Sequence, residues 1–163
     1  MILTPHILVG AVIGAKTQNL GLIVVLGLII HFIMDWIPHW DYINSGIKDF
    51  SKTKNFKALF LDFIKIAIDG LLGLLIVFLV LGQEKVLNPK YFLFILAGII
   101  ISLLPDISLG SAWYFGGESA EKYTNLHYKF LHYNKKEKEG KITFWGIMTQ
   151  ILIIIVCVFL LRL

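Results

Sequence analysis

Five apolar segments separated by polar stretches run along this chain of 163 residues. They cover about residues 3–15, 20–37, 57–82, 91–104 and 142–162. In lipid a helix satisfies its own backbone hydrogen bonds and an isolated strand does not, so each segment is predicted to be helical. The first and fourth are shorter than the roughly 20 residues of a full span, and we expect them to tilt little, thin the bilayer or enter it part-way. The pattern predicts an all-α fold, a polytopic membrane helical bundle of about five segments in a single domain.

A proline or a glycine marks the end of three of these segments. Pro38 follows the second segment, Gly82 closes the third, and Pro105 follows the fourth. A proline stops a helix and fixes the direction in which the chain leaves it, so the next side chain is held in a defined direction. That side chain is His39 in one case and Asp106 in the other. Both are therefore candidate ligands at helix ends.

Composition agrees with a membrane protein. Apolar residues make up 57% of the chain and charged residues 16%, whereas soluble domains have roughly 45–50% and 25%. The formal net charge of +4 indicates membrane topology or anionic lipid as its cause, and nothing in the sequence supports nucleic-acid binding. A single cysteine excludes an intrachain disulfide and a CxxC zinc site.

The basic residues predict an orientation. If every segment crosses, the loops of about 38–56 and 105–141 share one side with the N-terminus. That side holds ten lysines: Lys48, Lys52, Lys54, Lys57, Lys122, Lys129, Lys135, Lys136, Lys138 and Lys141. The other side holds Lys16, Lys85, Lys90 and Arg162. By the positive-inside rule the two loops are cytoplasmic, so we expect an integral protein of a prokaryotic inner (cytoplasmic) membrane with its N-terminus and site toward the cytoplasm.

The same topology brings every histidine and aspartate to one half of the membrane. Four of them interrupt apolar runs: His6, His31, Asp35 and Asp69. An ionisable group in such a position costs several kcal/mol unless it is paired. The length of the cytoplasmic loops explains the loop aspartates but not these four, which are the first candidates for a functional site.

A histidine and an aspartate one helical turn apart form the clearest motif. His31 and Asp35 are spaced i, i+4, so on a helix they project from one face and can hold one ion, for which zinc, manganese and iron are suitable. Asp69 lies deep in its segment, where a carboxylate requires a cation or a proton. We expect it to bind the metal or to accept a hydrogen bond from His31. Asp62 is expected at the surface, with Lys65 able to pair with either of these two aspartates.

The last loop contains two more histidines. KYTNLHYKFLHYNKKEKEGK, residues 122–141, is rich in lysine and aromatic residues and is typical of an amphipathic helix at a membrane surface. His127 is the stronger candidate for the site, and His132 and Glu118 are weaker ones.

These residues resemble a known family. TPHILVGAVIG near the N-terminus, LLPDI at a helix end and histidines gathered on one side are similar to the LexA-regulated hydrolases of bacterial inner membranes, which are described as metal-dependent. The resemblance implies that the family's site is formed here by Thr4, His6, Leu104, Pro105, Asp106 and His127. Ser108 stands where that family has a second aspartate. His31-x-x-x-Asp35 also resembles, more distantly, an element of zinc-dependent phospholipases C.

Three functions remain open. The favoured one is a metal-dependent hydrolase acting on a lipid or other phosphoester at the cytoplasmic face. It would bind one or two divalent ions, zinc above all, through His6, His31, Asp35, His39, Asp69, Asp106 and His127. Asp35 or Asp41 would be the general base, and lysines such as Lys129, Lys135 and Lys136 would attract an anionic lipid substrate.

The alternatives are an ion or proton transporter and a scaffold without catalysis. A transport path must cross the whole membrane, and Thr149 and Gln150 are the only polar residues of the last segment predicted to serve it in the far half. In a scaffold, the buried polar groups would only hydrogen-bond the helices together.

Overall fold

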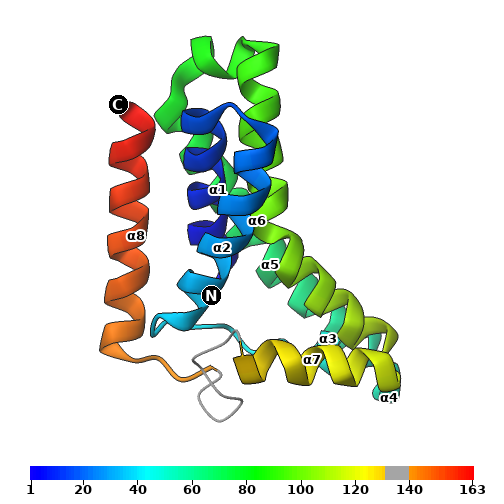
Figure 1. Cartoon of the computed structure of the whole chain (residues 1–163). Helices are drawn as coiled ribbons and strands as arrows, with labels where there is room; N and C mark the ends of the chain where they lie inside the picture. The colour runs from blue at the N-terminus through cyan, green and yellow to red at the C-terminus, as the bar shows by residue number, and fades with distance from the viewer. Residues whose placement is uncertain (131–139) are drawn as a thin grey trace.

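Helices make up nearly all of the structure. The computed structural model describes residues 1–130 and 140–163, apart from the side chains of 83–87 and 130. Within these ranges there are helices and no strand. They are α1 (Leu3–Thr17), α2 (Leu20–Trp36), α3 (Ser45–Lys48), α4 (Phe50–Thr53), α5 (Phe56–Leu87), α6 (Pro89–Phe115), α7 (Glu118–Phe130) and α8 (Phe144–Arg162). The predicted all-α bundle is confirmed, and each of the five apolar segments corresponds to one long helix (Figure 1).

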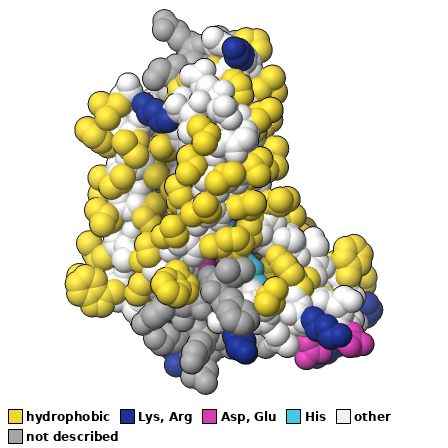
Figure 2. Space-filling model, in the orientation of Figure 1, with side chains coloured by type: hydrophobic (Ala, Val, Ile, Leu, Met, Phe, Trp, Pro, Cys, Tyr) yellow, Lys and Arg dark blue, Asp and Glu magenta, His cyan; other side chains and the backbone are white. Residues whose placement is uncertain are grey.

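Three of the helices are long and apolar enough to cross a membrane. They are α5 over Phe56–Gly82, α6 and α8. Helix α2 is apolar too but shorter. Large apolar side chains cover the outside of these helices, where lipid would surround them. Figure 2 shows hydrophobic side chains along the tall face of the bundle and basic side chains near its two ends, as expected of a membrane-spanning protein.

Helix α1 lies at the centre of the bundle and packs against α2, α5, α6 and α8. Its contact with α6 is so close that backbone meets backbone. A Cβ atom built on Gly10 would lie 2.5 Å from the carbonyl oxygen of Gly98. Gly14, one turn further along α1, meets the backbone of Phe94 in the same way. Small residues at these positions let the two helices approach, which is a common solution for packing in membranes.

Replacing Gly10 with leucine is therefore expected to lower the free energy of unfolding by about 3 kcal/mol, because the added side chain forces α1 and α6 apart. Thermal melting of the detergent-solubilised protein measures the effect. Gly21→Leu in α2 is the matched control, since a Cβ there meets only the side-chain oxygen of Asn19, at 3.3 Å. Equal melting temperatures for the two variants would contradict the close packing.

Helix α6 does not end at Pro105, and here the sequence prediction was wrong. The helix continues to Phe115, so the second long connection begins at Gly116. Proline removes one helical N–H, but beyond it Trp113 packs against the cluster that contains Ile47 of α3 and stacks on Tyr128 of α7, and Tyr114 stacks on Phe50 of α4. The chain does leave the helix before Pro38, where Ile37 is extended with ψ 145°, as is usual before a proline.

The third apolar segment breaks at Gly82, as predicted. Gly82 has φ 71°, a conformation that glycine adopts without strain. Beyond the break the chain forms helix again up to Leu87, within a stretch that was predicted to be a loop.

The predicted amphipathic helix is present as α7. It packs against α6 and lies across the lower end of the bundle in Figure 1. The sequence prediction extended it to residue 141, but residues 131–139 lie outside the described part of the chain. His132, Lys135 and Lys136 are among these residues.

Candidate metal centre

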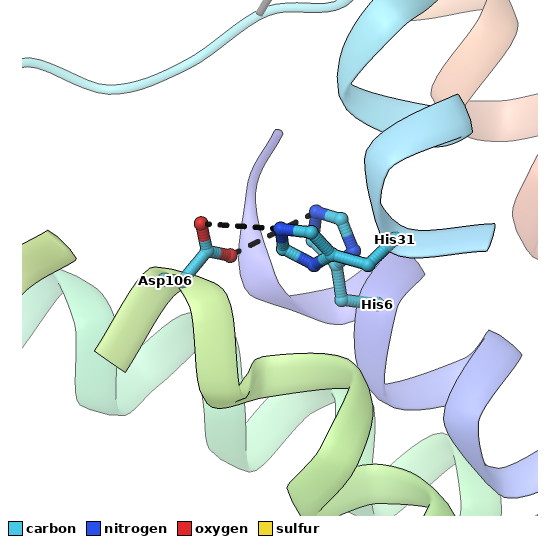
Figure 3. Close-up of side chains that lie close together, drawn as sticks. All are labelled: His6, His31 and Asp106. Carbon is cyan, nitrogen blue, oxygen red and sulfur yellow. Dashed lines mark ion pairs between the residues drawn. The ribbon is translucent and has the colours of Figure 1, made fainter. Parts of the chain in front are cut away.

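Side chains from three helices meet in the interior of the bundle. His6 comes from α1, His31 and Asp35 come from α2, and Asp106 comes from α6 one residue after Pro105. His6, His31 and Asp35 are completely buried, and the Asp106 side chain is 20% exposed. Figure 3 shows the Asp106 carboxylate directed at both imidazole rings. The prediction that separate apolar segments bring these residues together agrees with this arrangement.

Two carboxylates face the same two imidazoles. Asp35 Oδ1 lies 3.3 Å from His6 Nε2, and Asp35 Oδ2 lies 3.2 Å from His31 Nε2. Asp106 Oδ2 lies 3.8 Å from His6 Nε2, and its Oδ1 lies 3.9 Å from His31 Nε2. Ligand atoms at about 2.1 Å from a tetrahedral zinc ion stand about 3.4 Å from one another. The observed spacings are close to those of such a ligand set.

The tautomer of His31 is fixed by a backbone contact. Its Nδ1 lies 2.7 Å from the carbonyl oxygen of Ser102. A carbonyl only accepts hydrogen bonds, so Nδ1 carries the proton and donates it. In the neutral ring, Nε2 then presents a lone pair to Asp35 and Asp106, which also present lone pairs. A cation between them, either a proton or a metal ion, is needed to make this arrangement favourable.

His6 shows the same requirement. Among the described residues its Nδ1 has no hydrogen-bond partner, and its Nε2 lies only near the carboxylates of Asp35 and Asp106, although the ring is fully buried. The rings of His6 and His31 stack with centroids 4.4 Å apart, which brings both Nε2 atoms to the two carboxylates. Buried polar atoms without partners are rare in folded proteins and call for an explanation, such as an ion at the site.

His127 of α7 completes the cluster from outside the membrane-spanning helices. One ligand atom each from Asp35, Asp106 and His127 lies within 4.8 Å of the others, as is also true of His6, His31 and Asp106. Asp106 belongs to both groups. Burial lowers the pKa of the His127 imidazole, although Asp35 and Asp106 act in the opposite direction. The lowered pKa favours the neutral imidazole that a metal ligand must have.

Asp41 and His39 form a pair beside the cluster. Asp41 Oδ1 lies 3.0 Å from the amino group of Met1, which itself lies 2.9 Å from Asp35 Oδ1. His39 Nε2 is 3.0 Å from Asp41 Oδ2, and His39 Nδ1 is 2.7 Å from the Ile37 carbonyl oxygen. Both ring nitrogens of His39 thus have neighbours outside the cluster. The structure does not bring His39 into either group of converging ligand atoms.

Asp69 also lies outside those groups and takes a different role. Its carboxylate accepts hydrogen bonds from the backbone N–H groups of Leu3 and Thr4 and from the Thr4 hydroxyl, at 2.6 Å. These groups form the first turn of α1, where N–H donors lack helical partners. Asp69 therefore caps α1 and does not contact His31. Thr4, which the family resemblance placed in the site, acts here as Asp69's partner.

Three further expectations are corrected. Asp62, expected at the surface, is 3% exposed and accepts a hydrogen bond from the Ile47 N–H. Glu118 is exposed and pairs with Lys122 at 2.7 Å, away from the cluster. Thr149 and Gln150 donate to the carbonyls of Pro38 and Trp40, so they lie beside the segment that follows α2.

A cavity of about 490 Å³ adjoins the cluster. Its lining is mostly apolar but includes Asp41 and Asp106, so the ligand set is in contact with a space that a small molecule can occupy.

The sequence missed one residue of the centre, Ser102, whose carbonyl orients His31. Its only signal in the sequence is its place three residues before Pro105, because backbone contacts leave no mark on residue type. In donor type, spacing and burial the cluster fits a divalent metal ion. No protein-family model, curated protein or solved structure matches this chain.

Proposed function

We propose that the protein is a membrane-embedded, metal-dependent hydrolase that acts on a lipid or other phosphoester at the cytoplasmic face. The observation that carries the proposal is the convergence of His31 Nε2 on the carboxylates of Asp35 and Asp106 inside the bundle, at 3.2 Å and 3.9 Å. A divalent cation resolves this arrangement better than a shared proton does, because His6 and His127 bring further imidazoles to the same two carboxylates.

The cavity favours a catalytic centre over a structural one. Structural zinc sites are closed by four protein ligands, whereas catalytic sites keep a position open for water or substrate. Asp106 is at once part of the cluster and part of the cavity lining. A substrate in the cavity would therefore be in reach of the ligand set.

Each residue of the site has a separate role in this proposal. His6, His31 and Asp106 would hold one ion, and Asp35, Asp106 and His127 of α7 would hold a second. A divalent ion bound there supplies Lewis acidity, which activates water and polarises a phosphoryl oxygen. Asp35 is enclosed by the imidazoles and acts as a ligand, so Asp41, 23% exposed and at the cavity, is the better general base. His39 holds the Asp41 carboxylate in position.

Zinc is the metal we favour, since imidazole and carboxylate ligands suit it. The cytoplasmic orientation rests on the lysines of the two long connections. We also propose that the chain is related to the LexA-regulated inner-membrane hydrolases that its sequence resembles. A transport function is less well supported, because Thr149 and Gln150 lie beside the 38–40 segment and so do not extend a polar path across the bundle.

Elemental analysis of the detergent-solubilised protein tests the centre. We expect about one to two zinc ions per chain, lost in a His31→Ala, Asp35→Ala double variant together with hydrolysis of nitrophenyl phosphoesters. His39→Gln is the matched control and should retain the metal, because His39 lies outside both ligand groups. Full zinc content in the double variant would contradict the proposal.

A further inference from the structure

The cavity beside the metal centre is built mainly from two membrane helices. Leu59, Phe63 and Ile66 line it from α5, and Ile107 and Trp113 line it from α6. Phe63 and Ile107 are 51% and 56% exposed. The cavity therefore reaches the outer surface of helices that are apolar enough to span the membrane, so lipid chains have direct access to it.

The carboxylates in the cavity lining lie where the cavity adjoins the cluster. Asp41 and Asp106 are the only carboxylates in the lining, among the described residues. Elsewhere in the lining, Trp113 and Tyr128 make cation–π contacts with Lys48, whose Nζ lies 4.6 Å and 5.6 Å from the two ring centroids. A ligand suited to this cavity has a reactive polar group beside the cluster and an aliphatic part in the apolar region.

The volume of the cavity limits the length of the aliphatic part of the ligand. A water molecule's share of liquid volume is about 30 Å³, and a methylene group needs a similar space. The cavity of 490 Å³ then accommodates about 16 methylene groups on that scale. One aliphatic chain of a common membrane lipid fits, and two do not.

We propose that this cavity binds a single aliphatic chain of an anionic membrane amphiphile, entering from the bilayer between α5 and α6. The position of its phosphoester at the metal centre rests on the proposed function, whereas binding of the chain does not. A soluble phosphoester has no aliphatic chain to contact an apolar lining of this extent. The cavity therefore favours a membrane lipid as the substrate.

Gly110 offers a way to fill the cavity without disturbing the fold. It lies in the cavity lining, and a Cβ atom built on it meets no atom within 4 Å. Gly110→Leu should therefore fold normally while its side chain occupies the space of the lipid chain. Gly110→Val is a smaller filler, and Gly21→Leu in α2 is a matched control outside the cavity lining.

The probe is hexadecyl phosphate with a photoreactive diazirine in its chain, added to the protein in phosphatidylcholine nanodiscs. After irradiation, mass spectrometry should find the label on Phe63, Ile107 or Trp113. Labelling should fall about fivefold in Gly110→Leu, because the excluded chain loses its packing contacts. It should fall less in Gly110→Val and stay unchanged in Gly21→Leu.

Two results overturn the proposal: equal labelling of these residues in wild type and in a folded Gly110 variant, or label confined to other surfaces. The Gly110→Val variant provides the test if the leucine variant does not fold. The His31→Ala, Asp35→Ala double variant separates this inference from the proposed function. Labelling that persists there supports chain binding even if wild type contains no metal and hydrolyses nothing.

Discussion

Replacing Asp106 with asparagine is expected to lower phosphoester hydrolysis at least about a thousandfold and to abolish the effect of chelators on thermal stability. Asp106 is the one residue that belongs to both groups of converging ligand atoms, and it also lines the cavity. Asparagine keeps the shape of the side chain. It removes the negative charge and can turn an NH₂ group toward His6 or His31, and neither change allows tight metal binding.

The sign of the stability change distinguishes a metal from a buried ion pair. A metal that binds only the folded protein stabilises it by about 4 kcal/mol at a thousand times its Kd, so chelation should lower the melting temperature of wild type. The Asp106→Asn variant should not respond to chelation. Without metal it should melt above metal-free wild type, because the amide no longer repels the Asp35 carboxylate, which offers an oxygen within 4.8 Å of an Asp106 oxygen.

Asp49→Asn is the matched control, because Asp49 is exposed on the segment between α3 and α4 and lies in neither ligand group. It should retain both zinc content and the response to chelation. Zinc content and chelator response that are unchanged in Asp106→Asn would show that the convergence of imidazoles and carboxylates serves another purpose.

The main helices and part of the site follow from local features of the sequence. Apolar runs set the positions of the five long helices, since lipid permits few other structures. The i, i+4 spacing of His31 and Asp35 places both on one face of α2, where His31 Nε2 and Asp35 Oδ2 are 3.2 Å apart. Alternating helix directions then bring His6 and Asp106 to the same level of the bundle.

The two prolines show where local features fail. Pro38 and Pro105 each follow an apolar helix and precede a polar residue, and both were predicted to end a helix. Only Pro38 does so. At Pro105 the helix continues because α3, α4 and α7 pack against its extension, and the sequence around the proline contains no sign of those contacts.

The aspartates of α5 show a second limit. Asp62 and Asp69 lie on one helical face, and each accepts hydrogen bonds from the backbone of a neighbouring helix. Asp62 bonds to Ile47 of α3, and Asp69 bonds to Leu3 and Thr4 of α1. Asp62 also forms the predicted i, i+3 ion pair with Lys65, at 2.5 Å, but nothing in the sequence indicates the backbone donors that either aspartate finds. Partner identity depends on how separate helices dock.

Asp69→Ala is expected to lower the free energy of unfolding by about 3 kcal/mol, because it leaves the Leu3 and Thr4 N–H groups without their acceptor and the Thr4 hydroxyl with only the backbone carbonyl of residue 69. The negative carboxylate also faces the positive end of the α1 dipole. Since α1 holds His6, the substitution should act on the proposed metal centre only through the stability and position of this helix.

Melting curves with and without chelator decide between this role and metal ligation. If Asp69 caps α1, Asp69→Ala lowers both melting temperatures by a similar amount and the difference between them remains. If Asp69 is a ligand, the difference disappears, as it should in Asp106→Asn. Thr4→Val, which removes only the hydroxyl donor, should cost about 1 kcal/mol and leave zinc content unchanged. A Thr4→Val variant that loses zinc would mean that Thr4 and Asp69 belong to the metal centre itself.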